Sequence, residues 1–213
     1  LVADSEAIQK YLEETYKVPS VFIPYGAVPV GKPDQETLRA TGVEPYRYFL
    51  LIARMQPDNH VEEVIRGVIS SGSEHPLLVV GNTDNSFGRY LKKKYASGNI
   101  LFMDGIYDQT QLNSLRFFCK LYFHGHSAGG TNPSLLEAMA ASATIVAHNN
   151  DFNCSVLGDD ALWFVNEDEV AHAVANGITP EQQNRFVENN LIKIKTEYTW
   201  EKVIREYADL LLK

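Results

Sequence analysis

The chain has 213 residues, of which 45% are hydrophobic, so it is long enough to bury one sizeable core. Its formal net charge of −8 argues against nucleic acid or an anionic membrane surface as a partner. No apolar stretch approaches the roughly 20 residues of a membrane-spanning helix, and Cys119 and Cys154 lack the CxxC spacing of a redox or metal site, which indicates reduced thiols in a cytosolic protein.

The first elements of the chain form a short unit of their own. In order, we expect a strand at 1–3, a helix at about 5–16 with Ser5 as its N-cap, a strand-like stretch at 21–24, a linker at 25–33 and a small helix at 34–41. Proline and glycine are frequent in the stretch 25–33, which is typical of a linker.

Beyond this unit, short apolar stretches alternate with helical ones. Strands are expected at about 47–53, 77–81, 100–103, 120–123, 144–147 and 161–164, with helices near 60–71, 86–96, 109–117, 132–141, 167–176, 180–196 and 200–212. Continuous apolar strands joined by helical crossovers indicate a parallel sheet that is covered on both faces. The predicted fold class is α/β, a Rossmann-like doubly wound parallel sheet with a helical C-terminus.

The segment 124–140, with the sequence HGHSAGGTNPSLLEAMA, has the pattern of an anion site. It follows an apolar strand, and Gly129 and Gly130 remove side chains where the main chain must come close to a ligand. Asn132 is a good N-cap, and Pro133 suits the first position of a helix. A helix N-terminus after a glycine turn presents N–H groups and the positive end of the helix dipole, which bind phosphate.

One acidic residue completes this pattern. Gly130, Pro133 or Ser134, and Glu137 share one helix face, because residues three or four apart are neighbours on a helix. Glu137 then lies one turn, about 5 Å, behind the phosphate position. A carboxylate in that place suits a ribose diol, and the alternative is a solvated acid on the helix surface.

These motifs resemble the family 4 retaining glycosyltransferases, which have the GT-B fold. Ser134-Leu-Leu-Glu-Ala-Met-Ala140 after the glycine turn resembles their donor-site helix. The resemblance continues, in order, in Phe49-Leu-Leu-Ile-Ala-Arg54 followed by Pro57, Leu77-Leu-Val-Val-Gly81-Asn82, Ile100-Leu-Phe-Met-Asp-Gly-Ile106 and Tyr198-Thr-Trp-Glu201. It covers nearly the whole chain from about residue 45. His124-Gly-His-Ser127 and Gly129-Gly-Thr-Asn-Pro133 are most similar to the rhamnosyltransferase-related branch, which builds bacterial surface polysaccharides.

The resemblance implies a two-domain enzyme of which this chain is the donor-binding half. Residues 1–26 would be the tail of the N-terminal, acceptor-binding domain and the start of the linker, and residues 27–213 the nucleotide-sugar-binding, C-terminal domain of the GT-B fold. The acceptor site and some catalytic groups would lie in the other half, so we expect this chain to bind donor and to transfer little or nothing.

The implied reaction is retaining transfer of a hexosyl or deoxyhexosyl group. The donor would be a nucleotide-diphosphate sugar, either dTDP-rhamnose or a UDP sugar, and the acceptor a saccharide or a lipid-linked saccharide. The resemblance implies no other cofactor and no metal. It implies a cytoplasmic location, either free or, for the full-length protein, at the inner face of the membrane.

The resemblance also assigns individual residues. Arg54 would bind the diphosphate and Glu137 the ribose, and both would act in catalysis. The residues expected to bind the donor are Arg54, Gly81, Asn82, Gly105, Ile106, His126, Ser127, Gly129, Gly130, Thr131, Asn132 and Glu137. For His124 and His126 two roles are open: one of them contacts a phosphate or the acceptor, or the histidine is satisfied by a neighbouring carbonyl.

Two positions depart from the family's pattern. The glutamate that usually stands eight positions before the ribose acid is Gly129 here, and the lysine of the diphosphate pair falls on Asn59. We interpret both as marks of a specificity variant. Two alternatives stay open: a GT-B sugar-nucleotide epimerase, and a non-catalytic module that binds a sugar nucleotide.

Overall fold

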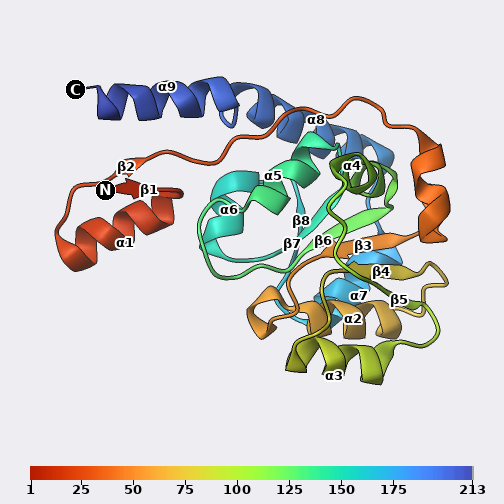
Figure 1. Cartoon of the computed structure of the whole chain (residues 1–213). Coiled ribbons are helices and arrows are strands. Elements are labelled where there is room, and N and C mark those ends of the chain that lie inside the picture. Colours follow the sequence, from red (N-terminus) through yellow and green to blue (C-terminus); the bar gives the residue numbers. More distant parts are fainter. Residues whose placement is uncertain (213) are drawn as a thin grey trace.

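Six short strands form a parallel sheet in the computed structural model, which describes residues 1–212 (Figure 1). Lys213, the last residue of the predicted domain 27–213, lies outside the described residues. The strands are β3 (Phe49–Ile52), β4 (Leu77–Val80), β5 (Ile100–Met103), β6 (Leu121–His124), β7 (Ile145–His148) and β8 (Leu162–Phe164). All neighbours are parallel, in the order β5-β4-β3-β6-β7-β8, which confirms the predicted doubly wound α/β fold.

Helices cover both faces of this sheet, which explains why its strands are apolar throughout. One face carries α4 (Gln109–Phe118), α5 (Pro133–Ala140) and α8 (Pro180–Thr196), and the other carries α2 (Val61–Ser70), α3 (Ser86–Tyr95) and α7 (Glu167–Asn176). Leu50 and Tyr122 pack into the first core, whereas Phe49 and Leu51 pack into the second. Consecutive residues of β3 enter opposite cores, as the two-residue period of a strand requires.

The helix α6 (Asp151–Leu157) was not predicted from the sequence. It begins at Asn150, whose side chain accepts the N–H groups of Phe152 and Asn153, both at 3.1 Å. A helix of 7 residues is too short to display the periodicity on which the sequence prediction relied. The remaining helical elements are the 3₁₀ helix η1 (Gln35–Thr41) and the last helix α9 (Trp200–Leu211), both at predicted places, and the 3₁₀ helix η2 (Pro57–Asn59), which was not predicted.

The N-terminal unit stands apart from the six-stranded sheet. It consists of β1 (Val2–Ala3), α1 (Glu6–Tyr16) and β2 (Val21–Phe22), and its two strands pair with each other in parallel. Figure 1 shows this unit beside α9. Ser5 caps α1 as predicted, because its hydroxyl accepts the N–H of Ile8 at 3.2 Å. The assignment of residues 1–26 to a separate acceptor domain stays a prediction.

The predicted linker at 25–33 has neither helix nor strand, but it is held to the rest of the chain. The N–H of Ala27 donates to the carbonyl of Tyr198 at 2.8 Å, and that of Val30 donates to the carbonyl of Ala140 at 2.9 Å. The stretch therefore runs as an extended strap along α5 and the start of α9.

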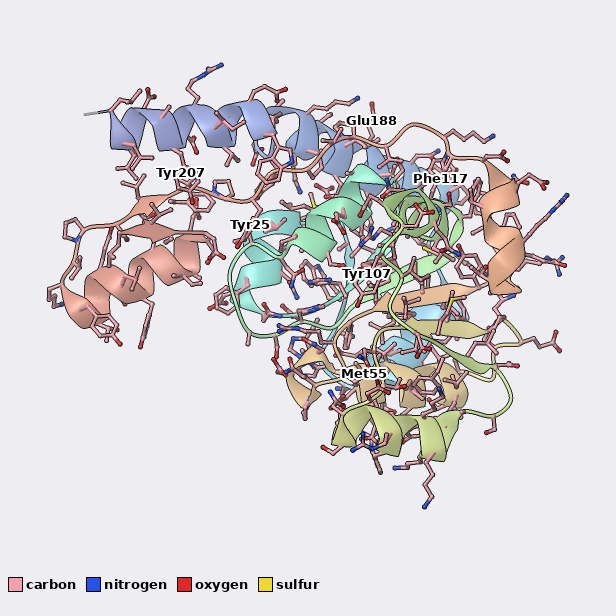
Figure 2. All side chains as sticks on the ribbon, viewed as in Figure 1. Tyr25, Met55, Tyr107, Phe117, Glu188 and Tyr207 are labelled. Atoms are coloured by element: carbon pink, nitrogen blue, oxygen red, sulfur yellow. The ribbon has the colours of Figure 1, made fainter. Side chains whose placement is uncertain are left out.

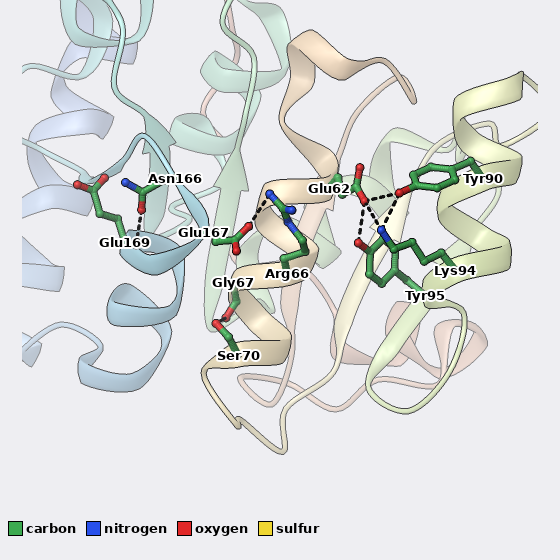
Figure 3. A network of polar contacts seen from close by, with 10 residues as sticks. All are labelled: Glu62, Arg66, Gly67, Ser70, Tyr90, Lys94, Tyr95, Asn166, Glu167 and Glu169. Carbon is green, nitrogen blue, oxygen red and sulfur yellow. Dashed lines mark hydrogen bonds and ion pairs between the residues drawn. The ribbon is translucent and has the colours of Figure 1, made fainter.

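Polar contacts fix α2 against its two neighbouring helices (Figure 3). One carboxylate oxygen of Glu62 accepts from three α3 side chains: Tyr90 at 2.8 Å, Lys94 at 3.0 Å and Tyr95 at 2.7 Å. On the other side, the Arg66 guanidinium pairs with Glu167 of α7 at 2.5 Å. These contacts join α2, α3 and α7 into one layer on this face of the sheet.

The sheet has one topological switch point, between β3 and β6. From β3 the chain proceeds to β4 and β5 on one side, and from β6 it proceeds to β7 and β8 on the other. Loops on the two sides leave the sheet in opposite directions there, so a crevice forms at the carboxyl ends of the strands, where doubly wound folds bind ligands.

Candidate functional site

A cavity of about 730 Å³ lies at this crevice. Its walls come from the ends of β3, β4 and β5, from the segment after β6 and from the first turn of α5: Ile52, Ala53, Arg54, Met55, Gln56, Val80, Gly81, Asn82, Asp84, Asn85, Gly105, Ile106, Tyr107, His126 and Ser134. Met55 and Tyr107 are labelled in Figure 2. The volume falls within the roughly 300–1,000 Å³ of small-molecule sites. We call this the switch-point cavity.

The structure brings half of the predicted donor-binding residues together around this cavity. Those that line it are Arg54, Gly81, Asn82, Gly105, Ile106 and His126. The others belong to the glycine turn and to α5 and do not line it: Ser127, Gly129, Gly130, Thr131, Asn132 and Glu137. The cavity also has a wall residue that was not predicted, Tyr107, whose side chain is 94% exposed.

Arg54 follows β3 and brings a positive charge to the cavity wall. Within residues 1–212 it forms no salt bridge, so its charge is available to a ligand. The side chain of Asn59, at the position where the resemblance implied a lysine, is buried and donates to the Arg54 carbonyl at 2.8 Å. Asn59 therefore shapes the turn that carries Arg54 and adds no charge to the site.

The loop after β4 runs close to the end of β3. A side chain at Gly81 would meet the Ala53 carbonyl, so only glycine allows this approach. The Asn82 side chain accepts the N–H of Asp84 at 2.7 Å, which folds the loop back on itself. The Asn85 amide donates to the Met55 carbonyl at 2.8 Å and joins the two loops.

Two histidines of the segment after β6 lie one behind the other. His124 is completely buried and stacks on His126, with ring centroids 4.6 Å apart. Burial, together with Arg54, lowers the pKa of His126 to about 4, although Asp58 opposes the shift. Burial also lowers the pKa of His124 well below its ordinary value. At neutral pH, His126 therefore presents an uncharged imidazole to the cavity.

Neither role considered for His124 is observed. Its side chain is 0% exposed and does not reach the cavity. In the part of the chain that the structure describes, its ring nitrogens have no hydrogen-bond partner, so no carbonyl satisfies them.

A second histidine pair contacts the same segment, the main chain that follows β6. His60 and His148 stack with ring centroids 3.9 Å apart, and Nδ1 of His60 lies 2.8 Å from the Gly125 carbonyl oxygen. Side-chain amides of Asn150 and Asn153 donate to the His126 carbonyl at 3.1 and 2.9 Å. These contacts hold the main chain after β6 in one position.

The glycine turn is tied to the N-terminal unit. The N–H and the hydroxyl of Thr131 both donate to the carbonyl of Asp4, at 3.2 and 2.5 Å. A side chain at Gly130 would meet the Asp4 carboxylate. Ser127 donates its N–H and its hydroxyl to the Asp58 carbonyl, at 3.1 and 2.9 Å. Ser127 and Thr131 were expected to bind the donor. In the structure, their N–H and hydroxyl groups hold the turn in place instead.

The start of α5 agrees with the sequence prediction. Asn132 is its N-cap and accepts the N–H of Ser134 at 2.9 Å, and Pro133 is the first helical residue. Among residues 1–212, the N–H groups of Gly129, Gly130 and Asn132 have no acceptor. These three main-chain amides can donate to a ligand, and the Asp4 carboxylate that lies against Gly130 is the negative charge with which an anion there would have to compete.

Glu137 is paired with an arginine that was not predicted as a site residue. Its Oε2 lies 2.5 Å from Nη2 of Arg116, whose side chain is 2% exposed, while 37% of the Glu137 side chain is exposed. Glu137 borders a smaller cavity of about 260 Å³, together with Pro133 and Trp200. The sequence did contain a signal for Arg116, because it shares the core face of the helix at 109–118 with Leu112 and Cys119, at i−4 and i+3.

No group of three or more histidine, cysteine, aspartate or glutamate residues is arranged to hold a metal ion within residues 1–212. In the same stretch no helix is long and apolar enough to cross a membrane.

Comparison with solved structures supports the architecture. The chain is similar to HepE (Alr3699) of Anabaena in complex with UDP and glucose, with a TM-score of 0.82 and 15% identity over 99% of this chain and 62% of that one. It is also similar to a glycosyltransferase from Rickettsia africae, with a TM-score of 0.77 and 14% identity over 98% and 62%. Sucrose-phosphate synthase from Thermosynechococcus elongatus gives a TM-score of 0.76 and 15% identity over 98% and 56%.

These similarities show the fold. The chain has the Rossmann-like α/β fold of a GT-B domain with a helical C-terminus, as predicted. It spans about 62% of the length of HepE. No family model and no curated protein sequence matches the chain.

Proposed function

We propose that this chain is the donor-binding part of a glycosyltransferase that uses a nucleotide-diphosphate sugar. The observation that carries the proposal is the switch-point cavity, where an apolar wall from three strands ends at Arg54. A nucleotide sugar matches this wall, because it has a flat aromatic base at one end, whose faces pack on apolar groups, and a diphosphate in its middle. The similarity to HepE, which was solved with UDP and with UDP-glucose, supports the same class of ligand.

Each part of the cavity suits one part of such a ligand. Gly105, Ile106 and Tyr107 form the wall after β5, where main-chain groups and an aromatic ring would hold the base. Arg54 would bind the diphosphate, since a planar guanidinium matches phosphate oxygens. Beside the cavity, the amides of Gly129 and Gly130 would bind the phosphate next to the sugar. Glu137, one helical turn after the cavity-lining Ser134, would bind the ribose.

The chemistry that these groups support is electrostatic. Transfer breaks the bond between the sugar and the diphosphate, and negative charge develops on the departing phosphate. Arg54 and the amides of the glycine turn would stabilise this charge, as fixed dipoles do in an oxyanion hole. His126 is neutral at pH 7, so it can contribute a hydrogen bond but no positive charge to this stabilisation. We propose that transfer is retaining, with the acceptor hydroxyl attacking from the face that the diphosphate leaves.

The finer assignments rest on the resemblance of the sequence to family 4 and to its rhamnosyltransferase-related branch. They are a hexosyl or deoxyhexosyl group, dTDP-rhamnose or a UDP sugar as donor, and a saccharide or lipid-linked acceptor in surface polysaccharide synthesis. Gly129 supports a sugar pocket that differs from the family's usual one, because it removes the side chain that would reach the hexose.

Calorimetry on this chain tests the proposal. We expect binding of UDP or dTDP and of their sugars, weaker binding of UMP, and still weaker binding of uridine, because the diphosphate supplies the contact with Arg54. A ligand at 100 times its dissociation constant adds about 2.7 kcal/mol of stability, so a thermal-shift assay gives an independent reading. Binding of GDP-mannose alone would overturn the donor assignment, and no binding of any nucleotide would overturn the proposal itself.

A further inference from the structure

Arg116 is buried next to Glu137, the residue that we propose as the ribose ligand. It projects from α4, and only 1% of the residue is exposed. Its Nη2 donates to Oε2 of Glu137 at 2.5 Å and to the hydroxyl of Ser134 at 3.4 Å. That hydroxyl in turn lies 2.9 Å from the Tyr122 hydroxyl. The four side chains form one network, and Ser134 also lines the switch-point cavity.

The buried guanidinium of Arg116 depends on Glu137, the acid of this network, for its counter-charge. A buried charge without a partner costs several kcal/mol, because water no longer solvates it. Within residues 1–212, Glu137 is the only carboxylate that forms a salt bridge with Arg116. Nε and Nη1 of Arg116 have no partner in the same part of the chain, and the Ser134 hydroxyl that Nη2 also contacts is uncharged, so Glu137 supplies the counter-charge alone. Breaking the ion pair would leave a buried guanidinium without a counter-charge, so the paired state is strongly favoured.

The pair also fixes how Glu137 faces outward. A glutamate on a helix surface samples many rotamers, and ordering it costs up to about 2 kcal/mol of side-chain entropy. Here one oxygen is bound to Arg116, and more than a third of the side chain stays exposed. Oε1 is left to accept a hydrogen bond from outside, in an orientation that the folded protein has already set.

We propose that Arg116 is a positioning residue that orients the Glu137 carboxylate toward a ribose hydroxyl of the bound nucleotide. The inference rests on the proposed function, because it concerns the ribose contact of that site. Arg116 touches no ligand itself. Its contribution to affinity passes through Glu137, so it exists only when the nucleotide has a hydroxyl for Glu137 to accept.

The test compares UDP with 2′,3′-dideoxy-UDP, which keeps the base and the diphosphate but has no ribose hydroxyl. Calorimetry would measure both ligands on wild type, Arg116→Met, Glu137→Gln and the double variant. We expect Arg116→Met to weaken UDP binding by about tenfold, the effect of losing one hydrogen bond to a charged group. Binding of dideoxy-UDP should not change. The double variant should bind UDP no more weakly than Glu137→Gln alone, because both changes remove the same contact.

Arg66→Met is the matched control. Arg66 and Glu167 form another arginine–glutamate pair at 2.5 Å, on the opposite face of the sheet and away from the cavity (Figure 3). Losing the Arg66–Glu167 pair should leave the ratio of the affinities for UDP and dideoxy-UDP at its wild-type value. If Arg116→Met does not fold, Arg116→Lys takes its place: it keeps the charge but loses the planar fork, and we expect a smaller loss that is again confined to UDP.

The outcomes separate this inference from the proposed function. Equal losses for UDP and dideoxy-UDP, or additive losses in the double variant, would show that Arg116 only supports the fold and would overturn the inference. A wild-type protein that binds both nucleotides equally would overturn it as well, while the proposed function stands. A wild-type protein that binds neither nucleotide would overturn both.

Discussion

The two halves of the sheet's carboxyl edge are built in different ways. The loops after β3, β4 and β5 surround an open cavity of about 730 Å³, where Arg54 has no salt bridge in the described chain and Tyr107 is 94% exposed. The segment after β6 is closed. Stacked histidines and the amides of Asn150 and Asn153 hold its main chain.

The two halves are suited to different tasks in a binding site. Loops with few internal contacts can adjust to a ligand at low cost, because little structure has to be broken. A segment with many internal hydrogen bonds keeps its amides in fixed directions, which favours electrostatic stabilisation. The closed half therefore supplies the geometry, and the open half supplies the surface on which a base and a diphosphate can lie.

Acid should break the closed half first. The pKa of His126 is about 4 in the folded chain, against an ordinary 6.5, so the unfolded chain binds more protons between these two pH values. The contribution of His126 to the free energy of unfolding is then highest above pH 6.5 and should fall by about 3 kcal/mol between pH 7 and pH 4. The lowered pKa of His124 adds to this fall. Urea unfolding at several pH values measures this loss.

The matched variants are His126→Gln and His172→Gln. His126→Gln should make the dependence on pH weaker by the contribution of His126 and leave that of His124, whereas His172→Gln, on the exposed side of α7, should keep the wild-type dependence. The same slope in all three proteins would show that the depressed pKa of His126 does not contribute to stability.

A single added methyl group should also destabilise the closed half. In Gly125→Ala the new Cβ would meet the main chain at Asn59, which cannot move as a flexible side chain can. We expect a loss of about 2 to 3 kcal/mol in the free energy of unfolding, the range for overpacking against a rigid neighbour. Gly31→Ala is the control, since nothing lies within 4 Å of its added Cβ. Equal stability of the two variants would contradict the rigid packing at Gly125.

The open half should depend most on Arg54. Replacing it with alanine should weaken UDP binding by about 2 kcal/mol, because a hydrogen bond to a charged group is lost. Uridine, which has no phosphate, should bind as it does to wild type. Calorimetry with both ligands measures the difference. A similar loss for UDP and uridine would assign Arg54 to the shape of the cavity wall.

Much of the fold could be predicted from the sequence, because its strands are short, apolar and separated by long helices. The glycine turn and the cap at Asn132 could be predicted from local rules alone. The histidine stacks and the Arg116–Glu137 pair could not, because they join residues that are far apart in the chain: 88 positions separate His60 from His148, and 21 separate Arg116 from Glu137. Periodicity says which side chains are buried, but not which of them meet.

The smallest effect should come from Tyr107. Its ring lies over Gly105 at the rim of the cavity, where it could stack on a base. Tyr107→Ala should weaken UDP binding by about 1 kcal/mol, the worth of an aromatic contact beyond its area. Tyr107→Phe should keep the affinity, because the ring stays. Since the side chain is 94% exposed, neither change should alter the stability of the free protein. If phenylalanine loses as much as alanine, the hydroxyl and not the ring makes the contact, and the open half binds its ligand through polar groups alone.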